Sequence, residues 1–201
     1  MTGDSLVQPL DAELARRLSD AGVRTTRDVR LGTGLSKSEL LDWGKLSRRQ
    51  AARHEPEATV VFIGANDGFD MTTADGRTVV CCGTAWTVEY AQRARAMMDV
   101  YRRRGAGTVY WLTVPAPRGR RAEVARAVNR ALRAAAAPYP RDVRIVDLVP
   151  RFTPGERYRD AIRVGGRRRA VREPDGIHLN GVGSEVAAGM VLDALRRDFR
   201  T

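Results

Sequence analysis

The hydrophobic and polar positions of the chain follow two periods, one typical of helices and one typical of buried strands. Apolar side chains recur at three- and four-residue intervals in five segments, which predicts amphipathic helices over residues 10–21, 40–54, 86–101, 122–137 and 183–200. Short apolar, β-branched or extended runs predict strands at 23–31, 59–63, 108–114 and 143–148.

Local signals refine these boundaries. Ser36 and Glu39 have the spacing of a capping box, so we expect them to open the helix that ends near His54. Residues 67–85 predict a longer loop with a small hairpin at 78–82. Residues 149–172, rich in Arg and Gly, predict an irregular loop.

The alternation of strands and helices predicts a single α/β domain over residues 1–201, with right-handed βαβ units and a parallel sheet covered on both faces. Such sheets bind ligands at the carboxyl ends of their strands. Only three residues precede Asp4, whereas a strand usually needs about five residues. The first strand is therefore either very short or encoded upstream of Met1, and we expect the second.

An upstream segment would also carry any signal peptide or anchor. The chain as it stands predicts a cytoplasmic protein, and a cell-envelope or secreted protein if a segment is missing. No apolar run approaches the roughly 20 residues of a membrane-spanning helix.

The composition differs from that of an average globular protein mainly in its excess of positive charge. The formal net charge is +11 and the pI is ≈ 10.8, almost entirely from arginine. A GC-rich genome explains such a bias, and so does an anionic partner such as an acidic glycan. The densest clusters are 102–104, 118–121 and 167–169. None is interleaved with aromatic side chains, so we expect no specific nucleic-acid partner.

The cysteines and histidines are few. Cys81 and Cys82 are adjacent and are the only cysteines, and neighbouring cysteines rarely bond to each other, so we expect no disulfide. With only His54 and His178, zinc-ligand spacing is lacking, and no metal or cofactor is predicted. We expect His54 to be structural or solvated.

The candidate chemistry lies at distant places in the chain. Ser5 precedes the first predicted helix, and Asp175 precedes His178 by three residues on a C-terminal loop. A serine hydroxyl needs an adjacent base to act as a nucleophile. The imidazole of His178 can accept the Ser5 proton, while Asp175 holds its Nδ1. The sequence therefore predicts a catalytic triad.

Two further residues are candidates for an oxyanion hole. Asn66 follows the strand at 59–63, and its amide can donate to a developing oxyanion. The backbone N–H groups of Ser5 and of a glycine would add to it. Gly34 is the preferred glycine, and Gly32 is an alternative.

Four segments together resemble the sequence blocks of the SGNH, or GDSL, hydrolase superfamily: Gly3–Leu6, Gly32–Leu35, Gly64–Asp67 and Asp175–His178. The stretch Thr33–Ser36 with Asp42 and Trp43 resembles the DUF459-type branch, whose bacterial members are often cell-envelope proteins. The resemblance spans nearly the whole chain.

This resemblance implies a flavodoxin-like three-layer α/β/α sandwich with about five parallel strands. It also implies Ser5 as nucleophile, Gly34 and Asn66 as oxyanion-hole residues, and Asp175 and His178 as the remaining triad members. The missing first strand is the one departure.

The expected activity is a serine esterase that removes short acyl groups, O-acetyl above all, through an acyl-serine intermediate, from a small ester or a carbohydrate or envelope glycan. An O-acyltransferase with the same triad is an alternative. A non-catalytic module that binds anionic polymer through its arginines is another. The basic loops at 118–121 and 167–169 would suit an anionic glycan.

Overall fold

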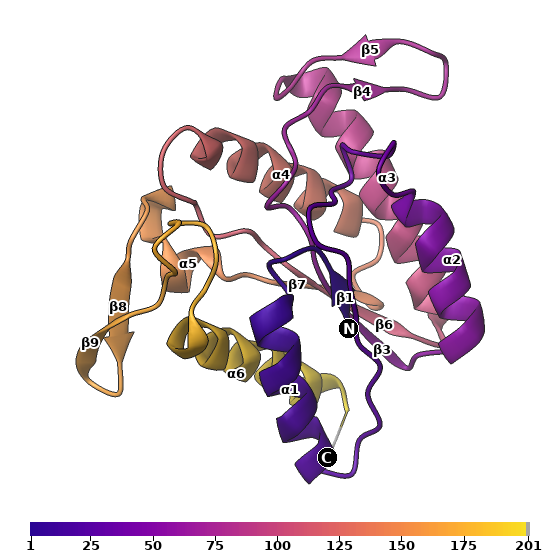
Figure 1. Ribbon diagram of the computed structural model, residues 1–201. Helices are drawn as coiled ribbons and strands as arrows, with labels where there is room; N and C mark the ends of the chain where they lie inside the picture. The colour runs from indigo at the N-terminus through magenta and orange to yellow at the C-terminus, as the bar shows by residue number, and fades with distance from the viewer. Residues whose placement is uncertain (200–201) are drawn as a thin grey trace.

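The computed structural model describes residues 1–199 and consists of a central parallel sheet between two layers of helices (Figure 1). The five strands lie in the order β2-β1-β3-β6-β7. Their bounds are β1 Thr2–Gly3, β2 Asp28–Val29, β3 Ala58–Phe62, β6 Thr108–Leu112 and β7 Val143–Val146. The predicted flavodoxin-like three-layer α/β/α class is therefore confirmed.

Helices α1 and α6 cover one face of the sheet, and α2, α3 and α4 cover the other (Figure 1). The helix bounds are α1 Gln8–Asp20, α2 Trp43–His54, α3 Thr84–Arg102, α4 Arg121–Ala136, α5 Val149–Phe152 and α6 Gly181–Asp198, with 3₁₀ turns η1 Arg103–Gly105 and η2 Pro154–Glu156. Because both faces of the sheet are covered, β3 and β6 are buried along nearly their whole length. Within residues 1–199, no helix is both long and apolar enough to cross a bilayer.

The first strand is formed by Thr2 and Gly3, so the expectation that it is encoded upstream of Met1 is wrong. β1 pairs in parallel with β2 on one side and β3 on the other. A Cβ at Gly3 would lie 2.1 Å from the carbonyl oxygen of Phe62, so only glycine allows β1 to approach β3 this closely. The strand is thus very short, and it delivers Ser5 to the carboxyl edge of the sheet.

The predicted capping box at Ser36 is wrong. Helix α2 begins at Trp43, and Asp42 is its N-cap, accepting a hydrogen bond from the backbone N–H of Lys45 at 2.8 Å. Ser36 instead donates its backbone N–H to the carboxylate of Asp67 at 2.7 Å. A tertiary contact therefore takes the place of the local cap, and residues 36–41 stay outside the helix.

The prediction of an irregular loop over 149–172 is also wrong. This segment holds α5, η2 and an antiparallel hairpin, β8 Ala161–Val164 with β9 Arg167–Ala170. Gly165 and Gly166 join the strands, both with positive φ, which suits a tight two-residue hairpin turn. All four residues of β9 are exposed, so the strand has no hydrophobic pattern by which it could be predicted.

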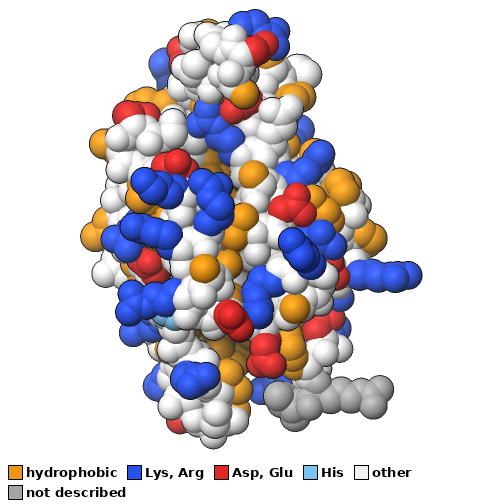
Figure 2. All heavy atoms as spheres, turned by 90° about the vertical axis from the view of Figure 1, so that its right-hand side faces the viewer, with side chains coloured by type: hydrophobic (Ala, Val, Ile, Leu, Met, Phe, Trp, Pro, Cys, Tyr) orange, Lys and Arg blue, Asp and Glu red, His pale blue; other side chains and the backbone are white. Residues whose placement is uncertain are grey.

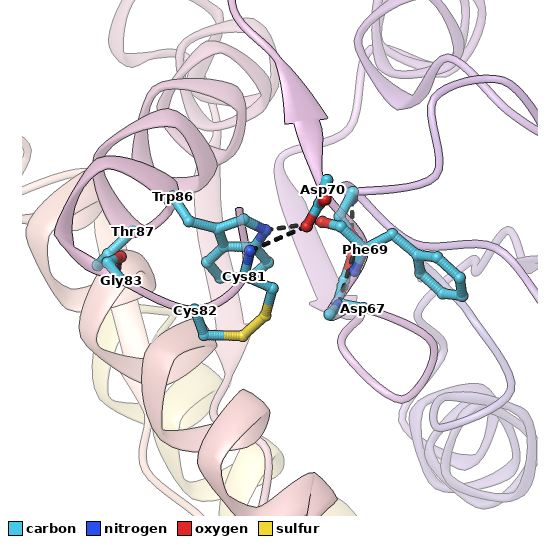
Figure 3. The surroundings of a disulfide bond; sticks show 10 residues. Asp67, Phe69, Asp70, Cys81, Cys82, Gly83, Trp86 and Thr87 are labelled. Carbon is cyan, nitrogen blue, oxygen red and sulfur yellow. Dashed lines mark hydrogen bonds between the residues drawn. A yellow bond between two sulfur atoms is a disulfide. The ribbon is translucent and has the colours of Figure 1, made fainter. Parts of the chain in front are cut away.

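The loop after β3 carries the second hairpin, which pairs β4 Met71–Thr72 with β5 Thr78–Val79. The loop does hold a hairpin, but the bounds predicted for it, 78–82, are wrong, because its first strand is Met71–Thr72 and its second ends at Val79. Cys81 and Cys82 are joined by a disulfide, so the prediction that they would not bond is wrong (Figure 3). The pair lies between β5 and α3, where the backbone N–H of Cys81 donates to Asp70 at 3.1 Å.

Candidate active site

Ser5 lies in the turn between β1 and α1, and a buried carboxylate fixes this turn. Asp4 is fully buried, and its carboxylate oxygens accept hydrogen bonds from the backbone N–H groups of Leu6, Gly64 and Ala65, each at 2.9 Å. Burial raises the pKa of Asp4 to about 7, against the opposing effect of these donors. Asp4 therefore ties the turn that carries Ser5 to the loop that carries Asn66.

His178 connects Ser5 to Asp175. The distance from His178 Nε2 to Ser5 Oγ is 2.7 Å, and from His178 Nδ1 to Asp175 Oδ2 it is 2.5 Å. The other oxygen of Asp175 accepts the backbone N–H groups of Ile177 and His178, at 2.8 and 3.0 Å. Partial burial acts to raise the pKa of Asp175, but these hydrogen bonds outweigh it, so the pKa lies below its ordinary value. The carboxylate is thus held ionised behind the imidazole.

A buried arginine holds the loop that carries Asp175 and His178. Arg172 is 7% exposed, and its guanidinium donates to the carbonyls of Ile177 at 2.6 Å and Ala116 at 3.1 Å. Desolvation lowers the pKa of Arg172 to about 10. The loop between β9 and α6 is therefore fastened to the loop after β6.

The oxyanion-hole candidates lie in adjacent loops. Asn66 donates one amide hydrogen to the carbonyl of Thr33 at 3.1 Å, which leaves the other amide hydrogen available. Within residues 1–199, the backbone N–H groups of Ser5 and Gly34 donate to no protein acceptor. These three donors come from the ends of β1, β2 and β3.

Of the two glycine candidates, Gly34 lies inside the site and Gly32 outside it. A Cβ at Gly34 would lie 2.6 Å from Oδ1 of Asp67, the residue after Asn66. Gly32 is exposed, has a φ of +73° and has no atom within 4 Å of such a Cβ. Gly32 is therefore a turn residue, and the packing favours Gly34.

Three supporting residues were not identified from the sequence. Asp67 is buried and accepts the hydroxyl of Tyr90 at 2.7 Å in addition to the backbone N–H of Ser36. Burial raises the pKa of Asp67. The hydroxyl of Ser36 accepts the backbone N–H groups of Gly68 and Phe69 at 3.2 and 3.3 Å. Asp67 and Ser36 each end a segment that resembles the hydrolase family, but the sequence does not show that the two residues contact each other.

Within residues 1–199, His54, Trp43 and Trp86 form no hydrogen bond with Ser5, Asp175 or His178. His54 is exposed at the end of α2. Trp43 and Trp86 are buried in the core, and the indole N–H of Trp86 donates to the carbonyl of Phe69 at 2.8 Å (Figure 3). No group of three His, Cys, Asp or Glu side chains within residues 1–199 is arranged to hold a metal ion. The candidate site thus consists of the Ser5 hydroxyl, the His178 imidazole, the Asp175 carboxylate and the N–H donors of Ser5, Gly34 and Asn66.

Comparisons with known proteins give a family and a fold. The sequence profile of a family described as "Protein of unknown function (DUF459)" matches residues 1–194. No protein of curated function matches the chain.

Solved structures share the fold at low identity. TesA is 21% identical, with a TM-score of 0.62, covering 98% of this chain and 96% of its own. A carbohydrate esterase family 3 structure from Talaromyces cellulolyticus is 16% identical, with a TM-score of 0.62 and coverages of 99% and 98%. A member of the lipolytic G-D-S-L family from Veillonella parvula is 16% identical, with a TM-score of 0.58 and coverages of 98% and 96%.

Proposed function

The chain belongs to the DUF459 family, and from its GDSL-type fold and the geometry of its site we propose that it is a serine esterase of short acyl esters. The observation that carries the proposal is the chain of contacts from Ser5 Oγ through the His178 ring to Asp175, at 2.7 and 2.5 Å. Each distance is within reach of direct proton transfer.

The reaction proceeds in two halves. His178 Nε2 accepts the hydroxyl proton as Ser5 Oγ bonds to the ester carbonyl carbon, and Asp175 stabilises the imidazolium. The N–H donors of Ser5, Gly34 and Asn66 bind the oxygen that becomes negative. The intermediate then collapses: the ester C–O bond breaks, and His178 returns the proton to the departing alcohol.

The second half repeats the chemistry with water. His178 deprotonates a water molecule that attacks the acyl-Ser5 carbonyl. The bond to Ser5 Oγ then breaks, His178 returns the proton to Ser5 Oγ, and the acid leaves. The two halves need no group beyond the side chains and backbone N–H groups already described. An added sugar hydroxyl in place of water would give acyl transfer through the same steps.

A small cavity lies between the loops after β3 and β6. It has a volume of about 10 Å³, and its walls include Ala65, Pro117, Val124 and Ile177 but not Ser5, Asn66 or His178. The proposed preference for short acyl esters therefore rests on the resemblance to the hydrolase family, and the esters below test it.

The experiment compares wild type with Ser5→Ala and His178→Ala on p-nitrophenyl acetate, p-nitrophenyl octanoate and acetylated xylan. We expect wild type to prefer the acetyl esters, and Ser5→Ala to lose activity by about 10⁴-fold or more. Ser5→Ala with wild-type turnover, or wild type without turnover on any ester, would refute the proposal. Faster appearance of acetylated sugar than of free acetate would instead identify an acyltransferase.

A further inference from the structure

The β8–β9 hairpin and its flanks carry a strong excess of positive charge. Residues 157–172 contain seven arginines and a single carboxylate, Asp160. Figure 1 shows the hairpin projecting from the body of the molecule beside α5 and α6. On the face that carries α2 and α3, by contrast, Figure 2 shows arginines interspersed with acidic side chains.

No acidic residue lies opposite an arginine in the pairing of the hairpin's two strands. Arg163 and Arg168 are directly opposite across the two strands, an arrangement in which like charges repel. Within residues 1–199, the one ion pair of the hairpin is Arg168 with Asp160 at 3.4 Å, and both side chains are more than 60% exposed. Such an exposed pair contributes little, so the positive charge of the hairpin is largely uncompensated.

The same arginines line an open hollow. Its volume is about 650 Å³, and its walls include Arg159, Arg163 and Arg168, together with Tyr158 and Asp160. A hollow of this size accommodates a few sugar residues rather than a single small ion. Three guanidinium groups around it would bind anionic groups spaced along such a chain.

Arg118 links the hollow to the loop that carries Asp175 and His178. Arg118 donates to the hydroxyl of Tyr158 at 3.1 Å, and its backbone N–H donates to the carbonyl of Gly176 at 3.0 Å, between Asp175 and His178. The backbone N–H of Val171, at the end of the hairpin, donates to the carbonyl of Asp160 at 2.8 Å. A polymer bound in the hollow would therefore be connected through Arg118 to the loop that carries Asp175 and His178.

The ring of Tyr158, in the wall of the hollow, already contacts two guanidinium groups of the protein. The guanidinium carbons of Arg118 and Arg172 lie 5.1 and 5.7 Å from the centroid of Tyr158. Single-stranded nucleic acids bind largely by stacking bases on free aromatic rings. A polymer whose anionic groups are carboxylates on sugar rings matches the hollow better.

We propose that the β8–β9 hairpin and its hollow are a subsite for an acidic glycan, which they hold while an ester on the same chain reacts at Ser5. The inference rests on the proposed function for the reaction, but the binding itself does not depend on turnover. It assigns the substrate class as an acylated polysaccharide that carries carboxylate groups.

The experiment measures binding of non-acetylated polygalacturonate oligomers to Ser5→Ala protein by calorimetry, at two salt concentrations. The hairpin variant carries Arg159→Gln, Arg163→Gln and Arg168→Gln. A matched control carries Arg48→Gln, Arg49→Gln and Arg53→Gln, three exposed arginines of α2. Urea unfolding checks that each protein is folded.

We expect the hairpin variant to bind about tenfold or more weakly, with a shallower salt dependence, because three favourable charge contacts are lost. The α2 variant should bind as tightly as its parent. Equal weakening in both variants, or none in either, would overturn the subsite. The assignment to a glycan would be overturned if single-stranded DNA bound the parent protein more tightly than polygalacturonate did, and if the hairpin variant lost this DNA binding.

Turnover separates this inference from the proposed function. In active protein, the kcat/KM ratio of acetylated polygalacturonate to neutral acetylated xylan should fall in the hairpin variant and not in the α2 variant. If no ester is hydrolysed at all, the proposed function fails, and the binding result still decides the subsite. If the triple variant does not fold, Arg163→Gln alone repeats the comparison with a smaller effect.

Discussion

Replacing Gly34 by alanine tests whether the backbone N–H of residue 34 is a donor in the proposed oxyanion hole. Gly34 does not have a positive φ, so an alanine fits the backbone, and space alone decides the outcome. The new Cβ would lie 2.6 Å from Oδ1 and 3.0 Å from Cγ of Asp67, whereas ordinary contacts begin at 3.4 Å. One of the two groups must therefore move by about 0.8 Å.

The carboxylate of Asp67 cannot move easily, because it is buried and holds the backbone N–H of Ser36 and the hydroxyl of Tyr90, both at 2.7 Å. The segment around Gly34 is then displaced, and its N–H leaves the narrow range of useful distances. Losing one such donor costs about 10²–10³-fold. We therefore expect Gly34→Ala to lower kcat on p-nitrophenyl acetate by about 10²-fold, and KM by much less.

Gly32→Ala is the matched control. It has an unfavourable φ of +73° but no neighbouring atom within 4 Å, so it should cost about 1 kcal/mol of unfolding free energy and leave kcat near the wild-type value. Steady-state kinetics and urea unfolding measure both quantities. A Gly34→Ala protein with wild-type kcat, or equal losses in both variants, would show that the N–H of Gly34 is not a donor to the oxyanion.

Three further predictions concern the supporting carboxylates and the loop between β2 and α2. Asp175→Asn should lower kcat by about 10³–10⁴-fold without a comparable loss of unfolding free energy, because the amide favours the wrong histidine tautomer; a loss under tenfold would contradict this role. Ser36→Ala should lower the unfolding free energy by about 2–4 kcal/mol in urea titrations, since two partly buried N–H groups lose their acceptor, and an unchanged midpoint would argue against it. The pKa of Asp4 is raised from 3.8 to about 7, so the native state binds the Asp4 proton more tightly than the unfolded state does. The contribution of this proton to the unfolding free energy is therefore complete below about pH 4 and is lost as the pH rises to about 7. Asp4→Asn should lack this decline, and parallel pH profiles of the two proteins would contradict the prediction.

The sequence determined the fold class because buried parallel strands have a strong local signature. The runs at 59–63 and 108–114 are apolar and β-branched, and they became β3 and β6 with boundaries within two residues. The helix at 122–137 likewise became α4, because its apolar face repeats at the helical period. Ser5 and the Asp175–His178 pair could be selected as candidates from their chemistry and from the segments that resemble the hydrolase superfamily, and Asn66 also because it closely follows β3.

Tertiary structure decided what depends on contacts between distant residues. Ser36 looked like a local cap, and only the structure shows that it contacts Asp67, in the loop that carries Asn66. The choice between Gly32 and Gly34 required the position of Asp67, 33 residues beyond Gly34. The arginine hairpin was invisible because β9 buries no residue, so its strand conformation comes from backbone pairing and from two glycines with positive φ rather than from hydrophobic periodicity.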